Sequence, residues 1–155
     1  MTLYLVRHAD AKSRSSWAAD DRLRPLTKRG ERQATALAGL VTPSSVRRVL
    51  SSPAVRCIDT VSPLASASRV GIEKTDVLAE GADPKNAYEM LLELAARKGD
   101  SVLCAHGDLI PELLRRAAKE GAKLTGGDRW SKGSTWVLAT THGKVTSGRY
   151  VPPPA

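Results

Sequence analysis

The sequence from residue 3 to residue 8 is Leu3-Tyr4-Leu5-Val6-Arg7-His8. Four apolar residues in succession are typical of a strand that is buried on both faces of a sheet. The run ends in a guanidinium and an imidazole, a pair that suits phosphoryl chemistry. Arg7 can hold two phosphate oxygens while a ring nitrogen of His8 approaches phosphorus. The same pair is also typical of a strand that ends in solvent, so its interpretation depends on the rest of the chain.

The length of 155 residues is that of one domain with its own core, and we expect a single domain over residues 1–155. Aromatic residues make up only 4% and phenylalanine is absent, so the core must be aliphatic. No apolar run approaches the length of a membrane span, and the sequence does not begin like a signal peptide. These features predict a soluble, cytoplasmic protein without a membrane partner.

The two cysteines, Cys57 and Cys104, fall at an expected helix start and in an expected buried strand. We interpret them as reduced structural residues, because small apolar side chains occupy such places in reducing compartments. A phosphatase loop of the Cys-x5-Arg type needs arginine six positions after cysteine. Those positions hold Pro63 and Ile110, so this class is excluded.

The formal net charge of +8 favours acidic partners by long-range attraction. Phosphorylated proteins and small phosphorylated molecules qualify as well as nucleic acids do. The basic residues are spread along the chain without interleaved aromatic residues or a nucleic-acid motif. We therefore expect a phosphorylated substrate and no specific nucleic-acid partner.

Apolar runs and helix signals alternate along the chain. Thr27 is a candidate N-cap, and Asp83 with Pro84 forms the strongest helix start. Ser52-Pro53 should open a second helix, which Pro63 should kink or end. The expected strands are 2–7, 46–51, one within 70–78, 101–105, and a hairpin of 135–140 with 145–151; the expected helices begin near residues 27, 52, 83 and 109.

Such alternation predicts a three-layer α/β/α fold, with a mostly parallel sheet and antiparallel pairing from the hairpin. Ligands of these folds bind beyond the carboxyl ends of the strands. Three polar clusters fall at such ends: Arg7-His8, then Ser51-Ser52-Pro53 with Arg56, then His106-Gly107-Asp108. Because all three clusters fall at strand ends, they support the interpretation of Arg7-His8 as part of a ligand site.

The ordered set Arg7-His8, Ser52-Pro53 with Arg56 and Thr60, and His106-Gly107 resembles the histidine phosphatase superfamily, which has the phosphoglycerate mutase-like fold. The short SixA-type phosphohistidine phosphatases are the most similar members. They share the segment seen here as Arg24-Pro25-Leu26-Thr27, with Arg29-Gly30 soon after. The stretches 20–22 and 132–138 also resemble the phosphatase-like C-terminal domain of actinobacterial MutT-type Nudix fusions.

The resemblance implies a role for each residue, and chemistry supports each one. His8 would be the nucleophile, and its other ring nitrogen should donate to a backbone carbonyl that fixes the tautomer. Arg7 and Arg56 would clamp phosphate oxygens, and His106 would add a donor or positive charge in the transition state. No metal and no cofactor are implied.

The proton donor is less well defined, because the chain lacks the long insertion that carries a glutamate in the mutases. Glu80 lies near the family's donor position, with a solvated loop glutamate as the alternative interpretation. Asp108 is a weaker candidate, since it can also cap the following helix. His142 lies in a predicted hairpin turn and is interpreted as structural. Ala9 stands where the family often has glycine, which we expect to leave activity intact.

These observations predict a metal-independent phosphatase that acts through a phosphohistidine on His8, with a SixA-type protein phosphohistidine substrate. A hydrolase of nucleoside di- or triphosphates, or of another small phosphate ester, is the first alternative. A catalytically silent phosphate-binding module is the second. The oligomeric state does not follow from the sequence.

Overall fold

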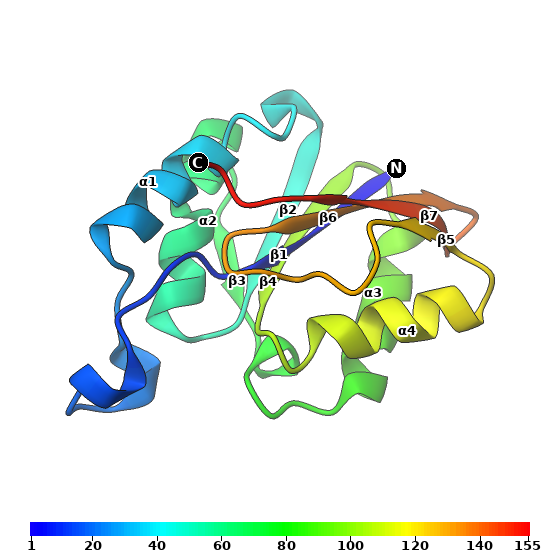
Figure 1. Ribbon diagram of the computed structural model, residues 1–155. Coiled ribbons are helices and arrows are strands. Elements are labelled where there is room, and N and C mark those ends of the chain that lie inside the picture. Colours follow the sequence, from blue (N-terminus) through cyan, green and yellow to red (C-terminus); the bar gives the residue numbers. More distant parts are fainter.

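The computed structural model describes residues 1–155 as a seven-stranded sheet with helices on both faces (Figure 1). The strands are β1 (Thr2–Arg7), β2 (Val46–Ser51), β3 (Ile72–Lys74), β4 (Asp100–Ala105), β5 (Lys123–Thr125), β6 (Thr135–Thr141) and β7 (Lys144–Val151). The helices are α1 (Lys28–Leu37), α2 (Val55–Ser68), α3 (Pro84–Ala95) and α4 (Ile110–Lys119), with short 3₁₀ turns η1 (Arg14–Ser16), η2 (Asp21–Leu23), η3 (Pro43–Ser45) and η4 (Asp76–Leu78).

The strand order is β3-β2-β4-β1-β6-β7-β5. Strand β1 pairs in parallel with β4, and β2 pairs in parallel with both β3 and β4. The hairpin of β6 and β7 adds antiparallel pairing beside β1. The predicted α/β class with a mostly parallel sheet is therefore confirmed. The short strand β5, which pairs in parallel with β7, was not predicted from the sequence.

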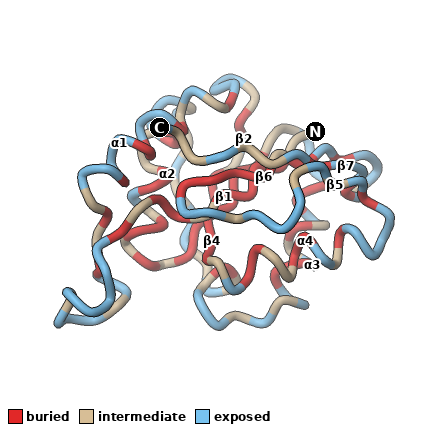
Figure 2. Tube along the Cα trace, in the orientation of Figure 1, coloured by how far each residue is buried: buried red, intermediate tan, exposed pale blue.

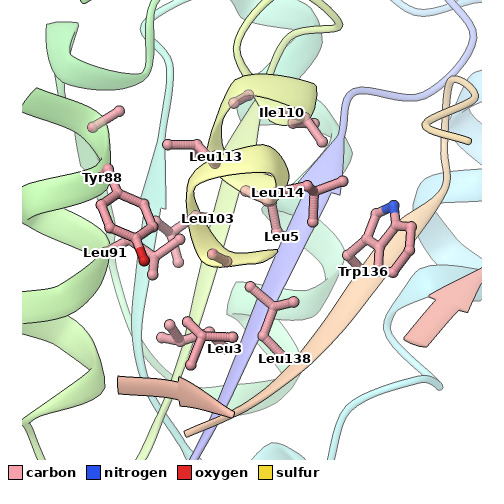
Figure 3. Packing of buried hydrophobic residues seen from close by; sticks show 14 of the residues in the cluster. Leu3, Leu5, Tyr88, Leu91, Leu103, Ile110, Leu113, Leu114, Trp136 and Leu138 are labelled. Atoms are coloured by element: carbon pink, nitrogen blue, oxygen red, sulfur yellow. The ribbon is translucent and has the colours of Figure 1, made fainter. Parts of the chain in front are cut away.

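The sheet separates two hydrophobic cores. Alternate residues of β1 enter different cores, because successive side chains of a strand point to opposite faces. Leu3 and Leu5 join the core shared with α3 and α4, whose packing appears in Figure 3. Tyr4 and Val6 join the core shared with α1 and α2. Figure 2 shows the buried strands between these layers. Because β1 is buried on both faces, no polar residue interrupts the run from residue 3 to residue 6.

Helix α1 begins as predicted, with the Thr27 hydroxyl accepting a hydrogen bond from the Gly30 amide at 3.0 Å. Gly30 also lets the segment after β1 pass close to the helix, since a Cβ there would lie 2.0 Å from the Asp10 carbonyl oxygen. The helix ends at Leu37. The start of α1 is thus fixed against the segment that follows His8.

Helix α2 begins later than predicted, and Pro63 does not end it. It begins at Val55, so Pro53 precedes it, and it continues through Pro63 to Ser68 without ending there. A proline inside a helix costs about 3 kcal/mol. Val61 and Leu64 on the same stretch are fully buried, and full burial of each such side chain contributes about 1.5–3 kcal/mol, which offsets that cost. Tertiary packing therefore overrides the local helix-breaking signal.

None of the helices combines the length and the apolar character required to cross a membrane.

Candidate active site

Five predicted site residues converge at the carboxyl edge of β1, β2 and β4. Arg7 and His8 end β1, Arg56 lies in the first turn of α2, and His106 follows β4. Glu80 lies in the loop after η4. A cavity of about 450 Å³ is lined by Arg7, His8, Glu80 and His106, and an adjoining cavity of about 360 Å³ is lined by Arg56, Glu80 and His106. The structure thus brings together residues from four separate parts of the chain.

The ring of His8 is buried and oriented by the main chain. Its Nδ1 lies 2.9 Å from the carbonyl oxygen of Ala9, so in the neutral tautomer Nδ1–H donates this bond and Nε2 keeps a free lone pair. Burial lowers the pKa of His8 to about 3, and the nearby charges of Arg56 and Arg7 act in the same direction. His8 is consequently neutral at physiological pH, as an attacking imidazole must be.

Arg7 is held in place by two main-chain segments. Its Nη1 donates to the carbonyl oxygen of Trp130 at 2.9 Å. Gly107 lies against the guanidinium plane, and a Cβ at this position would be 2.7 Å from the Arg7 Cζ atom. The buried Nε–H has no hydrogen-bond partner within the protein. The sequence analysis did not predict the contact with Trp130, and no sequence signal connects residues 123 positions apart.

Arg56 is 1% exposed and faces two carboxylates. Its Nη1 donates to the carbonyl oxygen of Asp21 at 2.8 Å and its Nη2 to Asp21 Oδ2 at 3.1 Å. Glu80 Oε2 lies 3.5 Å from the same Nη2. Carboxylate oxygens therefore lie at Nη2 and a main-chain carbonyl oxygen lies at Nη1, so both terminal nitrogens of Arg56 already face oxygen acceptors.

Asp21 also belongs to the site. The sequence analysis named it only within the stretch 20–22, which resembles the phosphatase-like domain of Nudix fusions, and gave it no role. Burial raises the pKa of its carboxyl, but a hydrogen bond from Arg24 and the charge of Arg56 outweigh that effect and lower the pKa overall. The Arg24 Nε atom lies 2.9 Å from Asp21 Oδ1. An ionised Asp21 thus links the segment after β1 to the first turn of α2.

Thr60 sets the register between the two halves of the site. Its hydroxyl oxygen accepts a hydrogen bond from the Ala9 amide at 2.9 Å and donates to the carbonyl of Arg56 at 2.6 Å. One side chain therefore fixes the residue after His8 against the helix that carries Arg56. These two hydrogen bonds explain why Thr60 belongs to the set of residues predicted from the sequence.

His106 is buried beside His8, with their ring centroids 5.4 Å apart. Its Nε2 lies 2.8 Å from the hydroxyl of Ser52 and 3.6 Å from Cys57 Sγ. Ser52 stands at the end of the neighbouring strand β2, so two strand ends together orient this imidazole. The arrangement places two histidines and two arginines around two adjoining polar cavities, and His106 lines both of them.

Both candidate proton donors lie at this cavity. Arg14 donates to both carboxylate oxygens of Glu80, with Nη2 2.7 Å from Oε2. Asp108 Oδ2 accepts from the Gly81 amide at 2.8 Å and so ties the Glu80 loop to the segment before α4. His142 lies in the exposed turn between β6 and β7, at the opposite edge of the sheet. No group of three or more His, Cys, Asp or Glu residues is placed to hold a metal ion.

Residues 3–82 match the model of the histidine phosphatase superfamily (branch 1). The chain is 38% identical, over 99% of its length, to an 8-oxo-(d)GTP phosphatase of Mycolicibacterium smegmatis, and it spans about half (48%) of that relative. Among solved structures, the protein histidine phosphatase SixA complexed with tungstate is 20% identical, with a TM-score of 0.76 over 98% of this chain and 95% of that one.

A Nakamurella multipartitia protein assigned as a SixA phosphohistidine phosphatase is 25% identical, with a TM-score of 0.71 over 99% of this chain and 96% of that one. The family model covers more than half of the chain, and the fold match extends over almost all of it. The resemblance inferred from Arg7-His8 and His106 is confirmed: the chain belongs to the histidine phosphatase superfamily.

Proposed function

We propose that residues 1–155 act as one domain that hydrolyses a terminal phosphoryl group through a phosphohistidine on His8, without a metal ion. His8 Nε2 attacks phosphorus, the bond to the leaving group breaks, and the leaving group departs with the bonding electron pair. Water then attacks the phosphohistidine, its P–N bond breaks, and inorganic phosphate leaves with His8 neutral again. The observation that carries this proposal is the buried, neutral imidazole with Nδ1 bound to the Ala9 carbonyl.

Arg7, Arg56 and His106 supply the charge stabilisation in this proposal. Donors that are already in place before the reaction stabilise the transition state without reorganisation. Arg56 must first exchange the Asp21 and Glu80 carboxylates for phosphate oxygens, which present the same kind of acceptor. Substrate binding therefore replaces an internal ion pair of the buried Arg56 with an ion pair to phosphate.

Glu80 is the proposed proton donor to the leaving group, because its carboxyl lines both cavities. In the substrate-free structure Arg14 binds this carboxylate through both oxygens. The carboxyl can donate a proton only after that pair opens. This requirement connects proton transfer to the arrival of substrate.

Two substrate classes are supported by different observations. A protein phosphohistidine is supported by the SixA-like fold and by the exposed segment Lys12–Asp20 beside the cavity, which a protein-borne side chain can approach. A nucleotide is supported by the 38% identity to the 8-oxo-(d)GTP phosphatase over nearly the whole chain. Both classes present a phosphoryl group at the end of a larger molecule.

Turnover of a phosphohistidine-carrying protein, of nucleoside di- and triphosphates and of an aryl phosphate tests the proposal directly. We expect phosphate release from at least one of these substrates, at the same rate with and without EDTA. EDTA can slow nucleotide turnover by removing metal from the nucleotide itself. The aryl phosphate is therefore the control that shows whether the enzyme needs a metal. A strict metal requirement with the aryl phosphate would contradict direct attack by His8.

Glu80→Gln should slow substrates with poor leaving groups, such as alkyl phosphates, by roughly 10²-fold, the lower end of general acid catalysis. Aryl phosphates should be almost unaffected, because their leaving groups depart as stable anions. The measurement is the dependence of rate on leaving-group pKa, which should be steeper in the variant than in the wild type. Equal slopes for the two proteins, measured where phosphoryl transfer limits the rate, would show that Glu80 takes no part in proton transfer.

A further inference from the structure

The cavity beside His8 extends beyond the residues that the phosphoryl group itself requires. No apolar side chain lines it. Arg14 and Lys132, from two widely separated segments, add cationic side chains to those of Arg7 and Arg24. In Figure 1 the segment with Arg14 projects from the body below α1, and Figure 2 shows much of it exposed. The reaction at His8 assigns no role to Lys132, and it involves Arg14 only as the partner of the Glu80 carboxylate.

Arg14 already holds an anion next to the phosphate-binding arginine. Its side chain is 65% exposed, yet it binds the Glu80 carboxylate with both oxygens. Glu80 Oε2 lies 2.7 Å from Arg14 Nη2 and 3.5 Å from Arg56 Nη2. One oxygen atom therefore contacts both guanidinium groups. An anion bound by Arg14 and an anion bound by Arg56 must be near neighbours.

Lys132 is anchored close to the nucleophile through the next residue. The Gly133 amide lies 2.9 Å from the carbonyl oxygen of His8 and 3.2 Å from that of Arg7. The backbone beside Lys132 is thus fixed to the end of β1. The Lys132 side chain is exposed and forms no ion pair within the chain, so its charge is available to a ligand.

We propose that Arg14 and Lys132 form a second anion subsite, which binds a phosphoryl group joined directly to the one that is transferred. The closeness of Arg14 and Arg56 fits two phosphoryl groups that share a bridging oxygen. A phosphoryl group also offers enough oxygens for a guanidinium and an ammonium together. The substrate class is then a molecule that ends in a diphosphate. This inference rests on the proposed function and chooses between its two substrate classes.

The subsite also gives a physical trigger for the proton donor. A second phosphoryl group that takes the Arg14 guanidinium displaces the Glu80 carboxylate from it. The freed carboxylate lies at the same cavity as His8, where it can take up a proton from solvent and pass it to the leaving group.

The test compares the binding of orthophosphate and of methylenediphosphonate, a diphosphate that cannot be hydrolysed, by calorimetry on the intact protein. Charge-assisted hydrogen bonds should make the diphosphonate bind about tenfold more tightly. In Arg14→Gln and in Lys132→Gln the ratio of the two dissociation constants should fall towards one. Arg115→Gln is the matched control, since its side chain is 67% exposed and paired with Glu112 on the same helix, outside both cavities. It should keep the wild-type ratio.

Phosphonoacetate carries a carboxylate in place of the second phosphoryl group. Its affinity shows whether the subsite prefers a phosphoryl group or a carboxylate. Tighter binding of phosphonoacetate than of the diphosphonate would overturn the diphosphate assignment and point to an acidic side chain beside a phosphorylated residue. Equal affinities for orthophosphate and diphosphonate would overturn the subsite while leaving the proposed function intact. If neither anion binds the wild-type protein, the phosphate site itself fails, and the subsite with it.

Discussion

His8→Ala is expected to reduce turnover by roughly 10⁴-fold or more, as loss of a covalent nucleophile does in other hydrolases. No other side chain in the cavity offers a neutral nitrogen that the main chain holds ready for attack. The Nδ1 bond to Ala9 is lost as well, but this costs only about 1–2 kcal/mol of stability. The variant should therefore fold, with an unchanged far-ultraviolet circular dichroism spectrum.

The measurement is covalent labelling with a radiolabelled phosphodonor. Wild-type protein should acquire a label that is stable in base and lost in acid, the signature of a phosphoramidate, and His8→Ala should acquire none. His142→Ala is the matched control, because His142 is exposed in the turn between β6 and β7 and should label normally. Wild-type labelling of His8→Ala would place the nucleophile elsewhere and remove the basis of the proposed mechanism.

Arg56→Lys is expected to lower kcat/KM by about 10²–10³, the usual effect of losing one well-placed transition-state donor. Arg56 presents Nη1 and Nη2 in a fixed plane, and both now hold oxygens of Asp21. A lysine keeps the charge opposite Asp21 and Glu80 but cannot reproduce the two parallel donors. The charge that stabilises the fold is retained, so the loss should appear in activity rather than in the melting temperature.

Arg48→Lys controls for the change of side chain, since Arg48 binds Ser101 Oγ at 3.0 Å and the carbonyl of Lys98 at 2.7 Å, away from the cavities. Its kinetics should match those of wild type, and inhibition by orthophosphate should weaken only in Arg56→Lys. Wild-type kinetics in Arg56→Lys would exclude a role in phosphate binding and leave Arg56 as the internal ion-pair partner of Asp21.

Local sequence signals predicted most of the elements that support the site. The caps at Thr27 and Asp83 were correct, since each side chain accepts a hydrogen bond from an amide two or three residues along the chain. Pro63 does not end α2, because the local cost of the proline is outweighed by the burial of α2 against the sheet. Strand β5 escaped prediction because its three residues are stabilised by pairing with β7, far along the chain.

The sequence by itself determined the alternating α/β class and the polar clusters at strand ends, because apolar periodicity and capping act over a few residues. It therefore indicated Arg7, His8, Arg56 and His106 as a group. Only the tertiary structure decided that the carboxylates of Asp21 and Glu80 contact the guanidinium of Arg56. The same is true of the hydrogen bond from Arg7 to the carbonyl of Trp130. Those contacts join residues 24 to 123 positions apart, and their geometry arises only when the sheet brings the strand ends together.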